Sequence, residues 1–386
     1  MIVLNNVETD SRVKREALAL KEEGYIVKII GVLKNPHDIH KINYKGIQIE
    51  LIKLHSRNLL PKNNLGWLIK YMEFIIKFVY KQFFIKTDVF HAHNLDALLP
   101  GYIVSRIKHT RIIYDSHELF TEMAGKNDNV INRIWFKIEK HLLRKVDFVI
   151  AANNSRAEIM LNEYGAKELP TVIMNIPDIN NTSANLKKNI FQDYLISKNI
   201  SQKKIVLYQG GIVKHRNISY LVKSVAKWHN DFALVLLGPI TELYKNELVD
   251  IMTEYSINNR VYFHPPVNSS VLLNFTKLAY IGVVIYNDST RNNYLCAPNK
   301  LFEYTLSGVP IIGCDFPEIE RVNSEFGVGE LFCPDNIDSI SSAINKMLDS
   351  KDKYMNKEKI SSITKKYNWN DQKKILLKLY EDLKLV

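Results

Sequence analysis

Residues 297–315 read Ala297-Pro-Asn-Lys-Leu-Phe-Glu-Tyr-Thr-Leu-Ser-Gly-Val-Pro-Ile-Ile-Gly-Cys-Asp315, and this stretch predicts a helix that runs directly into a strand. Pro298 suits the first turn of a helix, because its fixed φ is already helical and its missing N–H leaves no bond unmade there. Gly308 and Pro310 then end the helix, and the apolar run 311–313 begins the strand. A helix followed at once by an apolar strand is typical of an α/β protein.

The same alternation of short β-branched runs and longer helical patterns continues along the whole chain. In the first half we expect strands at 1–4, 25–31, 47–51, 89–92, 111–115 and 148–151, and helices at 13–23, 68–84, 132–144 and 155–163. In the second half we expect strands at 204–208, 232–237, 261–263, 281–285, 310–313 and 330–332. The pattern predicts an α/β fold with two Rossmann-like domains whose parallel sheets face each other across a cleft.

The length of 386 residues exceeds what one compact core usually needs and suits two domains. Strand and helix periodicity weakens in the Asn-, Ser- and Lys-rich stretch 177–203, where turn residues collect. We therefore expect a first domain over 1–178, a linker over 179–203, a second domain over 204–365 and a helical end over 366–386.

The composition, with 46% hydrophobic and 24% charged residues, is that of a globular protein. Three cysteines without metal-site spacing predict reduced thiols, and neither a secretory leader nor an 18-residue apolar run is visible, so we expect a cytoplasmic protein. The net charge of +11 predicts an anionic partner. Nucleic acid is the weakest choice, because no nucleic-acid-binding motif accompanies the basic residues.

The predicted helix that starts near Pro298 offers a candidate site for a phosphorylated ligand. Unpaired N–H groups and the dipole at a helix start attract anions, and Lys300 adds a mobile positive charge. One turn later Glu303 is an acceptor-only group suited to a pair of ribose hydroxyls. A surface helix that carries an ordinary acid is the alternative interpretation.

A second candidate follows the strand 204–208, in the segment Tyr208-Gln-Gly-Gly-Ile-Val-Lys-His-Arg-Asn217. Gly210 and Gly211 allow the backbone to approach a diphosphate closely, and Arg216 can bind it through a planar, bidentate guanidinium. The alternative is a tight turn with solvated basic side chains.

In the first half, polar side chains follow three predicted strands or turns. His117 and Glu118 come directly after the strand 111–115, and His93 comes after 89–92. An imidazole there can bond a sugar hydroxyl or a phosphate oxygen, or can cap the next helix. Asp10 and Arg12 precede the first helix, where Asp10 can face a ligand or serve only as an N-cap.

These segments resemble the family 4 retaining glycosyltransferases, in the subgroup with a Pro-Asn-Lys-Leu-Phe-Glu-Tyr donor motif. The loop after Tyr208 is similar to the family's Gly-Gly-x-x-x-x-Arg-Gly loop, and 114–119 resembles its Tyr-Asp-x-His-Glu-Leu signature. The usual donor motif has two glutamates eight positions apart. The second matches Glu303, but the first falls at Leu295, so Asn293 and Tyr294 are the candidate substitutes.

The resemblance spans nearly the whole chain and implies the GT-B fold, with 1–178 on the acceptor side, 204–365 binding a nucleotide sugar and 366–386 returning to the first domain. It implies retaining, metal-independent hexosyl transfer without a cofactor, from a nucleotide-diphosphate donor, first a UDP-sugar, to a glycan or lipid-linked acceptor in bacterial surface polysaccharide or lipopolysaccharide synthesis. The candidate catalytic residues are His117, Arg216 and Lys300. The candidate donor-binding residues are Gly210, Gly211, Arg216, Tyr294, Pro298, Asn299, Lys300, Leu301 and Glu303. The acceptor-side residues are Asp10, Arg12, His93 and Glu118, and no metal ligands are expected.

The basic stretch 57–86 predicts a peripheral contact with an anionic membrane, which would place the protein on the inner face of the plasma membrane. In the helix 67–84, one face holds Leu68, Met72, Ile75, Val79 and Phe83, and the opposite face holds Lys70, Lys77 and Lys81 with Trp67, Phe74 and Phe78 beside them. Aromatic residues among lysines suit a bilayer surface. Aromatic flanks buried against neighbouring loops are the alternative.

Two other functions fit the same fold. A nucleotide-sugar 2-epimerase acts on the donor alone, so an assay without acceptor separates it from a transferase. A non-catalytic partner that binds a nucleotide sugar is compatible with the missing carboxylate at Leu295.

Overall fold

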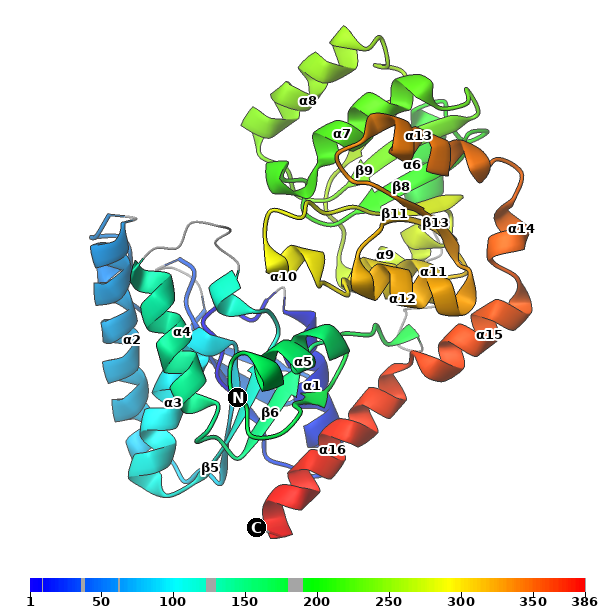
Figure 1. Cartoon of the computed structure of the whole chain (residues 1–386). Helices are drawn as coiled ribbons and strands as arrows, with labels where there is room; N and C mark the ends of the chain where they lie inside the picture. The colour runs from blue at the N-terminus through cyan, green and yellow to red at the C-terminus, as the bar shows by residue number, and fades with distance from the viewer. Residues whose placement is uncertain (9, 36–38, 62, 123–129, 180–189, 386) are drawn as a thin grey trace. The chain divides into compact units, whose positions relative to one another are not determined.

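The computed structural model describes residues 1–8, 10–35, 39–61, 63–122, 130–179 and 190–385 (Figure 1). By internal packing the chain divides into two units, Met1–Met174 with Gln372–Val386, and Asn175–Asp371. Of the linker expected over 179–203, residues 180–189 lie outside the described part, as do Thr9 and Lys62. Helix α6 (Ile190–Ser197) already belongs to the second unit.

The first unit contains a sheet that the N-terminal residues hold together. Its strands are β1 (Lys28–Val32), β2 (Lys41–Tyr44), β3 (Ile47–Ile52), β4 (Val89–His93), β5 (Arg111–Ser116), β6 (Phe148–Ala151) and β7 (Thr171–Val172). They are ordered β1-β3-β2 and β4-β5-β6-β7. Ile2 pairs in parallel with Ile30 of β1 and Ala92 of β4, so the expected strand 1–4 appears as a bridge that joins the two groups.

The first unit departs from the expected all-parallel sheet at β2, which pairs antiparallel with β3. Tyr44 lies opposite Ile47, so the hairpin loop is Lys45 and Gly46, and both have positive φ, 50° and 80°. Two left-handed residues give a loop whose twist matches the strands. Neither β2 nor the two-residue β7 was among the predicted strands.

Helices cover this sheet, and polar side chains define where several of them start. They are α1 (Ser11–Glu22), α2 (Asn64–Phe83), α3 (Leu95–Lys108), α4 (Val130–Leu142) and α5 (Asn154–Asn162), with 3-10 turns η1 (His55–Arg57) and η2 (Phe120–Glu122). Asp10, Asn63 and Asn153 each accept a backbone N–H of the first turn that would otherwise lack a partner.

The second unit has one parallel sheet of six strands. They are β8 (Lys204–Gln209), β9 (Phe232–Leu237), β10 (Val261–His264), β11 (Ile281–Val284), β12 (Ile311–Cys314) and β13 (Gly329–Phe332). The order is β10-β9-β8-β11-β12-β13. The chain therefore reverses its winding direction between β8 and β11, and in such sheets ligands bind beyond the carboxyl ends of the two strands at that point.

Helices flank this sheet, as connections between its strands or, from α13 on, after the last strand. They are α7 (Ile218–Ser224), α8 (Glu242–Glu254), α9 (Ser269–Thr276), α10 (Arg291–Tyr294), α11 (Asn299–Leu306), α12 (Pro317–Phe326), α13 (Ile337–Lys346), α14 (Lys351–Tyr354) and α15 (Lys357–Lys366), with 3-10 turns η4 (Lys214–Arg216) and η5 (Val225–Lys227). Tyr304 fixes α11 on the sheet, because its ring lies where a Cβ on Gly282 would approach to 2.3 Å. Its hydroxyl donates to Leu207 O (2.7 Å) and accepts from Gln209 N (3.0 Å).

The last helix, α16 (Trp369–Leu385), carries the chain into the first unit at Gln372. Gln372 accepts the N–H of Met174 (2.6 Å), Lys373 pairs with Glu22 (2.5 Å), and the Tyr380 hydroxyl lies 2.9 Å from His91 Nδ1. The predicted return of the C-terminal helix to the first domain is confirmed. Among the described helices, none combines the length and apolar character that crossing a bilayer requires.

Candidate functional site

The end of β8 forms a tight turn that brings the backbone of two strands together. Gly210 has a φ of +118° and Gly238, after β9, a φ of +151°. A Cβ on Gly238 would lie 1.9 Å from the Gly210 carbonyl oxygen, so only glycine fits there. The turn therefore leaves the backbone at the carboxyl end of β8 uncovered by side chains of its own.

Arg216 and Lys300 converge on this turn, although they are far apart in sequence. A Cβ placed on Gly210 would be 3.5 Å from Arg216 Nη1 and 3.8 Å from Lys300 Nζ, so both cations border the same point. Arg216 Nη1 donates to Gly211 O (3.3 Å) and lies 3.5 Å from the Tyr208 hydroxyl. The structure thus brings together the two cations that the sequence analysis selected.

Lys300 is buried among aromatic rings rather than paired with a carboxylate. Its Nζ lies 4.0 Å from the centre of the Tyr208 ring and 4.9 Å from that of Tyr286. Burial lowers the pKa of Lys300, and its Nζ has no hydrogen-bond acceptor among the described residues. A desolvated cation in this state is unfavourable unless an anion joins it. The site is therefore chemically suited to a phosphate group.

Glu303 is held beside the same turn by a short chain of hydrogen bonds. Gln209 Nε2 donates to Glu303 Oε2 (2.5 Å), and Gln209 Oε1 accepts the Thr276 hydroxyl proton (2.9 Å). These two bonds fix the orientation of the Gln209 amide and place the carboxylate of Glu303. We call Gln209, Gly210, Arg216, Lys300 and Glu303 the β8 turn site.

Other predicted donor-binding residues lie at the start of α11. Pro298 is the N-cap residue, one position before the place expected for it, and Asn299 begins the helix. The Leu301 side chain is fully buried, and its backbone N–H already donates to Pro298 O. Neither group of Leu301 is therefore available to a ligand. Tyr294 is partly exposed and packs against Phe316, while Leu295 is buried.

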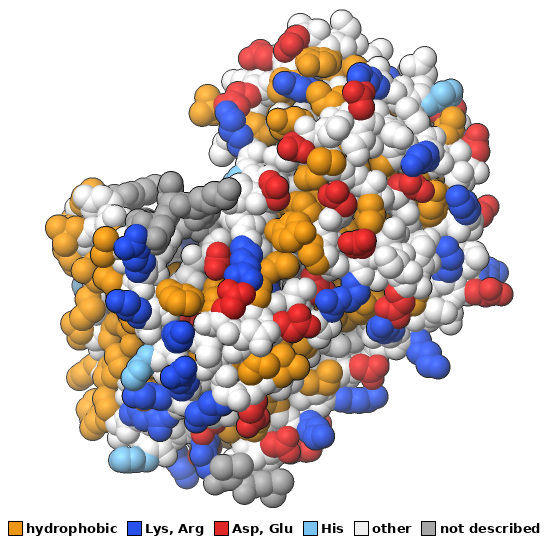
Figure 2. Space-filling view, viewed as in Figure 1, with side chains coloured by type: hydrophobic (Ala, Val, Ile, Leu, Met, Phe, Trp, Pro, Cys, Tyr) orange, Lys and Arg blue, Asp and Glu red, His pale blue; other side chains and the backbone are white. Residues whose placement is uncertain are grey.

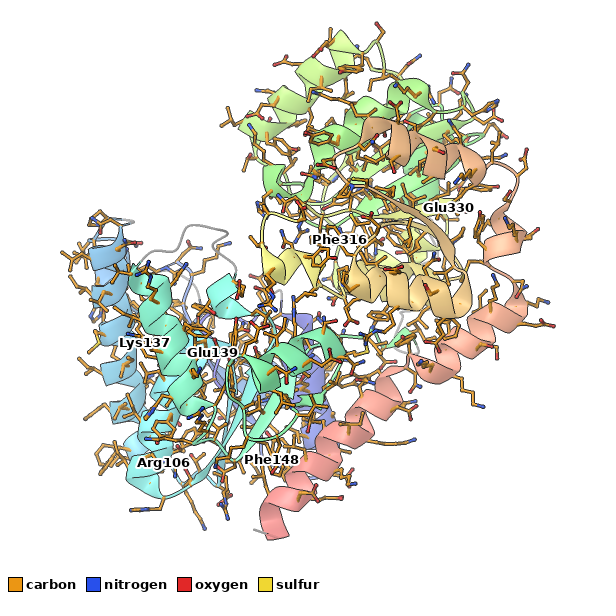
Figure 3. The ribbon with its side chains drawn as sticks, viewed as in Figure 1. Arg106, Lys137, Glu139, Phe148, Phe316 and Glu330 are labelled. Carbon is orange, nitrogen blue, oxygen red and sulfur yellow. The ribbon has the colours of Figure 1, made fainter. Side chains whose placement is uncertain are left out.

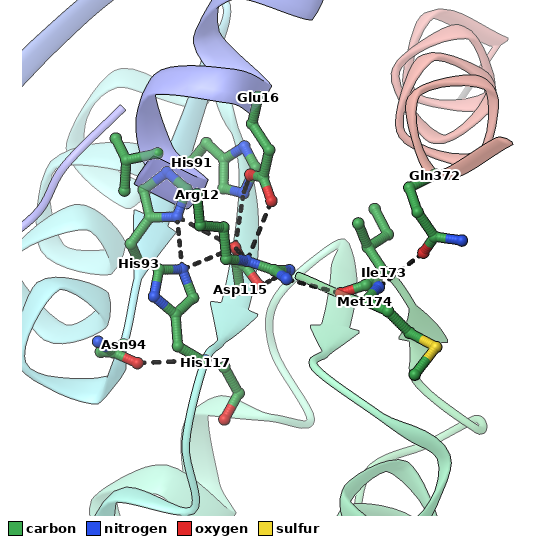
Figure 4. Close-up of polar contacts among 12 residues, drawn as sticks. Arg12, Glu16, His91, His93, Asn94, Asp115, His117, Ile173, Met174 and Gln372 are labelled. Atoms are coloured by element: carbon green, nitrogen blue, oxygen red, sulfur yellow. Dashed lines mark hydrogen bonds and ion pairs between the residues drawn. The ribbon is translucent and has the colours of Figure 1, made fainter. Parts of the chain in front are cut away.

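The first unit has a separate group of ionisable side chains, which we call the ionic cluster: Arg12, Glu16, His91, His93, Asp115 and His117 (Figure 4). All are buried except His117, which is partly exposed. Arg12 donates to both oxygens of Asp115 (2.7 and 2.9 Å) and to Ile173 O (2.6 Å). His117 Nε2 lies 2.9 Å from Asp115 Oδ2, and His93 Nδ1 lies 3.1 Å from the same oxygen. Asp115 is therefore the centre on which one arginine and two imidazoles converge.

The charges in the ionic cluster follow from burial and from Asp115. Burial favours a protonated Asp115, but Arg12 and His117 hold its pKa well below the usual value. Burial opposes a charge on His117, yet Asp115 outweighs this and raises the pKa of His117. His93, more deeply buried, has its pKa lowered to about 4. Burial and the nearby Asp115 raise the pKa of Glu16 to about 8, so Glu16 is protonated at neutral pH.

Glu16 is expected to make the first unit less stable as pH rises. Its folded pKa of about 8 lies above the reference 4.5, so the folded state holds the extra proton. The stability that this proton contributes is fully present below about pH 4.5 and is lost as the pH rises toward 8. Glu16→Gln keeps the neutral shape, so the free energy of unfolding from urea titrations should change less over this range than in the wild type.

Glu139 contributes in the same direction, because burial raises its pKa to about 7. Glu139→Gln is therefore a matched control, which should remove its own share of the pH dependence and leave that of Glu16. An unchanged slope in Glu16→Gln would contradict the assignment of a protonated Glu16.

The remaining first-half candidates take local structural positions. Asp10 caps α1 and accepts an N–H from Asn5 Nδ2 (2.9 Å). The N–H of His117 donates to Asn94 Oδ1 (3.1 Å), which orients the turn after β5. Glu118 accepts the Ser116 hydroxyl proton through its backbone carbonyl (2.9 Å). The ionic cluster therefore includes Arg12, His93 and His117 of the predicted residues, but not Asp10 or Glu118.

The structure also groups four possible metal ligands that the sequence analysis did not combine. Glu16, His91, His93 and Asp115 each place a donor atom within 4.8 Å of the others. Arg12 already supplies positive charge there, with its Nε 3.0 Å from Glu16 Oε1 and its Nη2 bonded to Asp115. A divalent ion would have to enter beside that guanidinium, so these residues are a poor fit for a metal.

Sequence reasoning missed the residues that position the candidates. Asp115, Tyr208 and Gln209 all stand at the last positions of β5 and β8, and strand ends are a signal that would have selected them. Tyr286 and Thr276 carry no such signal, because only folding brings them to the β8 turn.

Two family models match the chain. Residues 191–367 match the model described as glycosyl transferases group 1, and residues 11–180 match that described as glycosyltransferase family 4. The chain is a GT-B glycosyltransferase. This glycosyltransferase is 22% identical over 313 residues to TuaH of Bacillus subtilis (strain 168), named for glycosyl transfer in teichuronic acid biosynthesis, over 74% of this chain and 75% of TuaH.

Solved structures share the fold of this glycosyltransferase over its full length. Sucrose-phosphate synthase from Thermosynechococcus elongatus superposes with a TM-score of 0.82 at 16% identity, covering 99% of this chain and 98% of the synthase. HepE of Anabaena, in complex with UDP-glucose, superposes with a TM-score of 0.74 at 16% identity, covering 100% of this chain and 98% of HepE. The predicted GT-B class with two Rossmann-like halves is confirmed.

Proposed function

We propose that this glycosyltransferase moves a hexosyl group from a UDP-sugar to a glycan or lipid-linked acceptor of a bacterial surface polysaccharide or lipopolysaccharide, with retention of configuration and without a metal ion or other cofactor. Two similarities support the substrates: HepE binds UDP-glucose, and TuaH is named for teichuronic acid synthesis. The donor motif that resembles family 4 supports retention. The single observation that carries the proposal is the buried, unpaired ammonium of Lys300 beside Arg216 at the β8 turn.

The donor diphosphate would bind at this turn. Lys300 and Arg216 would each contact phosphate oxygens, and the N–H groups of Asn299 and Lys300 at the start of α11 would add donors. The backbone of Gly210 and Gly211 leaves room for the diphosphate. Charge develops on the leaving diphosphate in the transition state, so these groups supply the largest catalytic contribution.

The nucleoside would be held by Glu303. Its carboxylate accepts hydrogen bonds from the ribose hydroxyls, while Gln209 and Thr276 keep it in place. Tyr294 and Asn293 would contact the donor sugar, because Leu295 has no polar group there.

On the acceptor side, we assign His117 to the transferred sugar and the leaving phosphate. The acceptor hydroxyl attacks the anomeric carbon as its bond to the phosphate breaks, and the hydroxyl proton passes to the leaving phosphate oxygen. Arg12 and His93 are enclosed with Asp115, so they would position His117 rather than touch the substrate. Asp10 and Glu118 would line the acceptor path.

Thermal unfolding with a panel of nucleotide sugars tests the donor assignment. A ligand at 100 times its dissociation constant adds about 2.7 kcal/mol of stability. We expect UDP-glucose or another UDP-sugar to stabilise the wild type, and Arg216→Ala and Glu303→Ala each to abolish the shift while the free protein stays folded. Arg321→Ala is the matched control, because Arg321 lies on α12 and pairs only with Glu318 among the described residues.

Three results would argue against the proposal. Stabilisation that survives in both variants would place the donor elsewhere. Consumption of the UDP-sugar without an acceptor would favour the 2-epimerase. Donor binding with no transfer to any acceptor would favour a non-catalytic partner.

We also propose a peripheral contact between the first unit and the inner face of the plasma membrane.

A further inference from the structure

Helix α2 has two apolar faces, of which only one is packed against the protein. The packed face consists of Tyr71, Phe74, Ile75 and Phe78, which are all buried. The centre of the Tyr71 ring lies 5.4 Å from that of Trp135 on α4. A second set is between 42% and 70% exposed and, apart from the adjacent Leu68 and Ile69, recurs every three or four positions: Leu65, Leu68, Ile69, Met72, Ile76, Tyr80 and Phe83. Such spacing puts the second set in one stripe along the helix. We call it the α2 stripe.

The face that the sequence analysis selected for membrane contact is used inside the protein instead. Phe74 and Phe78 lie in the core. Lys70 donates to Leu60 O (3.0 Å), Lys77 pairs with Glu73 (2.5 Å), and Lys81 pairs with Glu50 (2.5 Å). Of the aromatic residues predicted beside the lysines, Phe74 and Phe78 are thus buried, as the alternative interpretation has it, while Trp67 is 40% exposed.

Cations for an anionic surface come from the neighbouring helix. Four exposed basic residues lie on α4 and just after it: Arg133, Lys137, Lys140 and Arg144. Their spacing of four, three and four positions puts them on one side of the helix. The one acid of α4, Glu139, is buried and accepts the Tyr114 hydroxyl proton (2.7 Å). Among the described residues, neither Lys137 nor Lys140 has an ion-pair partner. We call these four the α4 cations.

The stripe and the cations lie on adjacent parts of one surface. Trp135 of α4 contacts Trp67 and Tyr71 of α2 edge-on (5.8 and 5.4 Å). Val130 and Ile134 extend the apolar band onto α4, being 69% and 52% exposed. In Figure 2 the orange side chains form a column along α2 with blue side chains beside it, and Figure 3 labels Lys137 and Arg106 in this region.

We infer that the α2 stripe and the α4 cations dock this unit on an anionic phospholipid bilayer. Exposed apolar patches of this kind mark interaction surfaces, and an apolar helix face flanked by Lys and Arg is the pattern of an interfacial helix. The apolar side chains enter the headgroup boundary, and the cations bind lipid phosphates. This docking rests on the membrane contact in the proposed function and names the surface that makes it. It does not depend on the donor or on catalysis.

Flotation of the full chain with vesicles tests the docking. The probes are vesicles of phosphatidylglycerol and phosphatidylcholine in equal parts, and vesicles of phosphatidylcholine alone. We expect binding to the first, weakened by salt, and little to the second. Lys137→Glu/Lys140→Glu should weaken binding by about thirtyfold or more, and Leu68→Ser/Met72→Ser/Ile76→Ser should abolish it.

Matched controls on the second unit separate docking from general charge or apolarity. Lys277→Glu/Lys357→Glu reverses two exposed lysines, and Leu243→Ser removes a side chain on α8 that is 76% exposed. Both should bind like the wild type. All these positions are on the surface, so unchanged thermal unfolding will show that the variants are folded.

Three outcomes would overturn the inference. The wild type would not float with the anionic vesicles, or both surface variants would float as it does. Alternatively, sedimentation would show a dimer of the wild type that Ile76→Ser dissociates, without lipid binding, which would make a second copy the occupant of the stripe.

Discussion

Lys300→Met is expected to lower kcat/KM for sugar transfer by about 100- to 1,000-fold while leaving the free protein at least as stable as the wild type. Lys300 is buried against Tyr208 and Tyr286, and its ammonium has no hydrogen-bond acceptor among the described residues. Methionine fills a similar volume without a charge to desolvate, so the fold loses nothing. The leaving diphosphate loses a buried cation, which is where the rate should fall. Steady-state kinetics and thermal unfolding measure the two effects.

The combination of lower activity and retained stability is what identifies a functional cation. Lys351→Met is the matched control, since Lys351 lies 5.8 Å from the Tyr280 ring on another part of the same unit. It should leave both kinetics and nucleotide stabilisation unchanged. If Lys300→Met unfolded the free protein, or if its kcat/KM equalled that of the wild type, Lys300 would be a packing residue.

Asp115→Asn is expected to reduce the free energy of unfolding by about 3–5 kcal/mol. Arg12 is 3% exposed, and Asp115 accepts two of its hydrogen bonds, so the amide removes the ionised carboxylate that neutralises this buried guanidinium. The same change should lower the pKa of His117, because Asp115 raises it. Urea unfolding and the NMR titration of His117 measure these effects.

Glu325→Gln is the control, because it breaks an ion pair with Lys366 whose side chains are 36% and 53% exposed. This variant should lower the free energy of unfolding by only about 0–1 kcal/mol. Arg12→Met/Asp115→Asn should recover much of the loss, since removing both charges leaves no buried ion unpaired. This double variant keeps the test decisive if Asp115→Asn does not fold. A loss below about 1 kcal/mol in Asp115→Asn would contradict a buried pair at the centre of the ionic cluster.

Periodicity predicted apolar strands in both units well, but not a short, exposed one. The strands 232–237 and 148–151 were predicted with the observed bounds, because continuous apolar runs between turn residues leave few alternatives. The β2–β3 hairpin was missed, since β2 is four residues long and mostly exposed. No apolar pattern marks such a strand, and only its pairing with β3 defines it.

The apolar period of α2 was identified, but its direction was not. Leu68, Met72 and Phe83 of the predicted apolar face are exposed, but Ile75 of the same face is buried, as are Phe74 and Phe78 of the opposite one. A helix that is apolar on two sides gives no sign of which side the core will cover. The packing of Trp135 and the ion pairs of Lys77 and Lys81 decide it.

From residue order alone one obtains the two α/β halves, the glycine turn after β8 and the helix start that holds Lys300, because each depends on local backbone preference and apolar spacing. The meeting of Lys300 with Arg216, and the placement of Arg12, Asp115 and His117 in one cluster, depend on tertiary structure. Lys300 is 84 positions from Arg216, and Arg12 is more than 100 positions from both Asp115 and His117. Their distances and charges arise only when parallel strands bring their carboxyl ends to one edge of a sheet and burial removes the water.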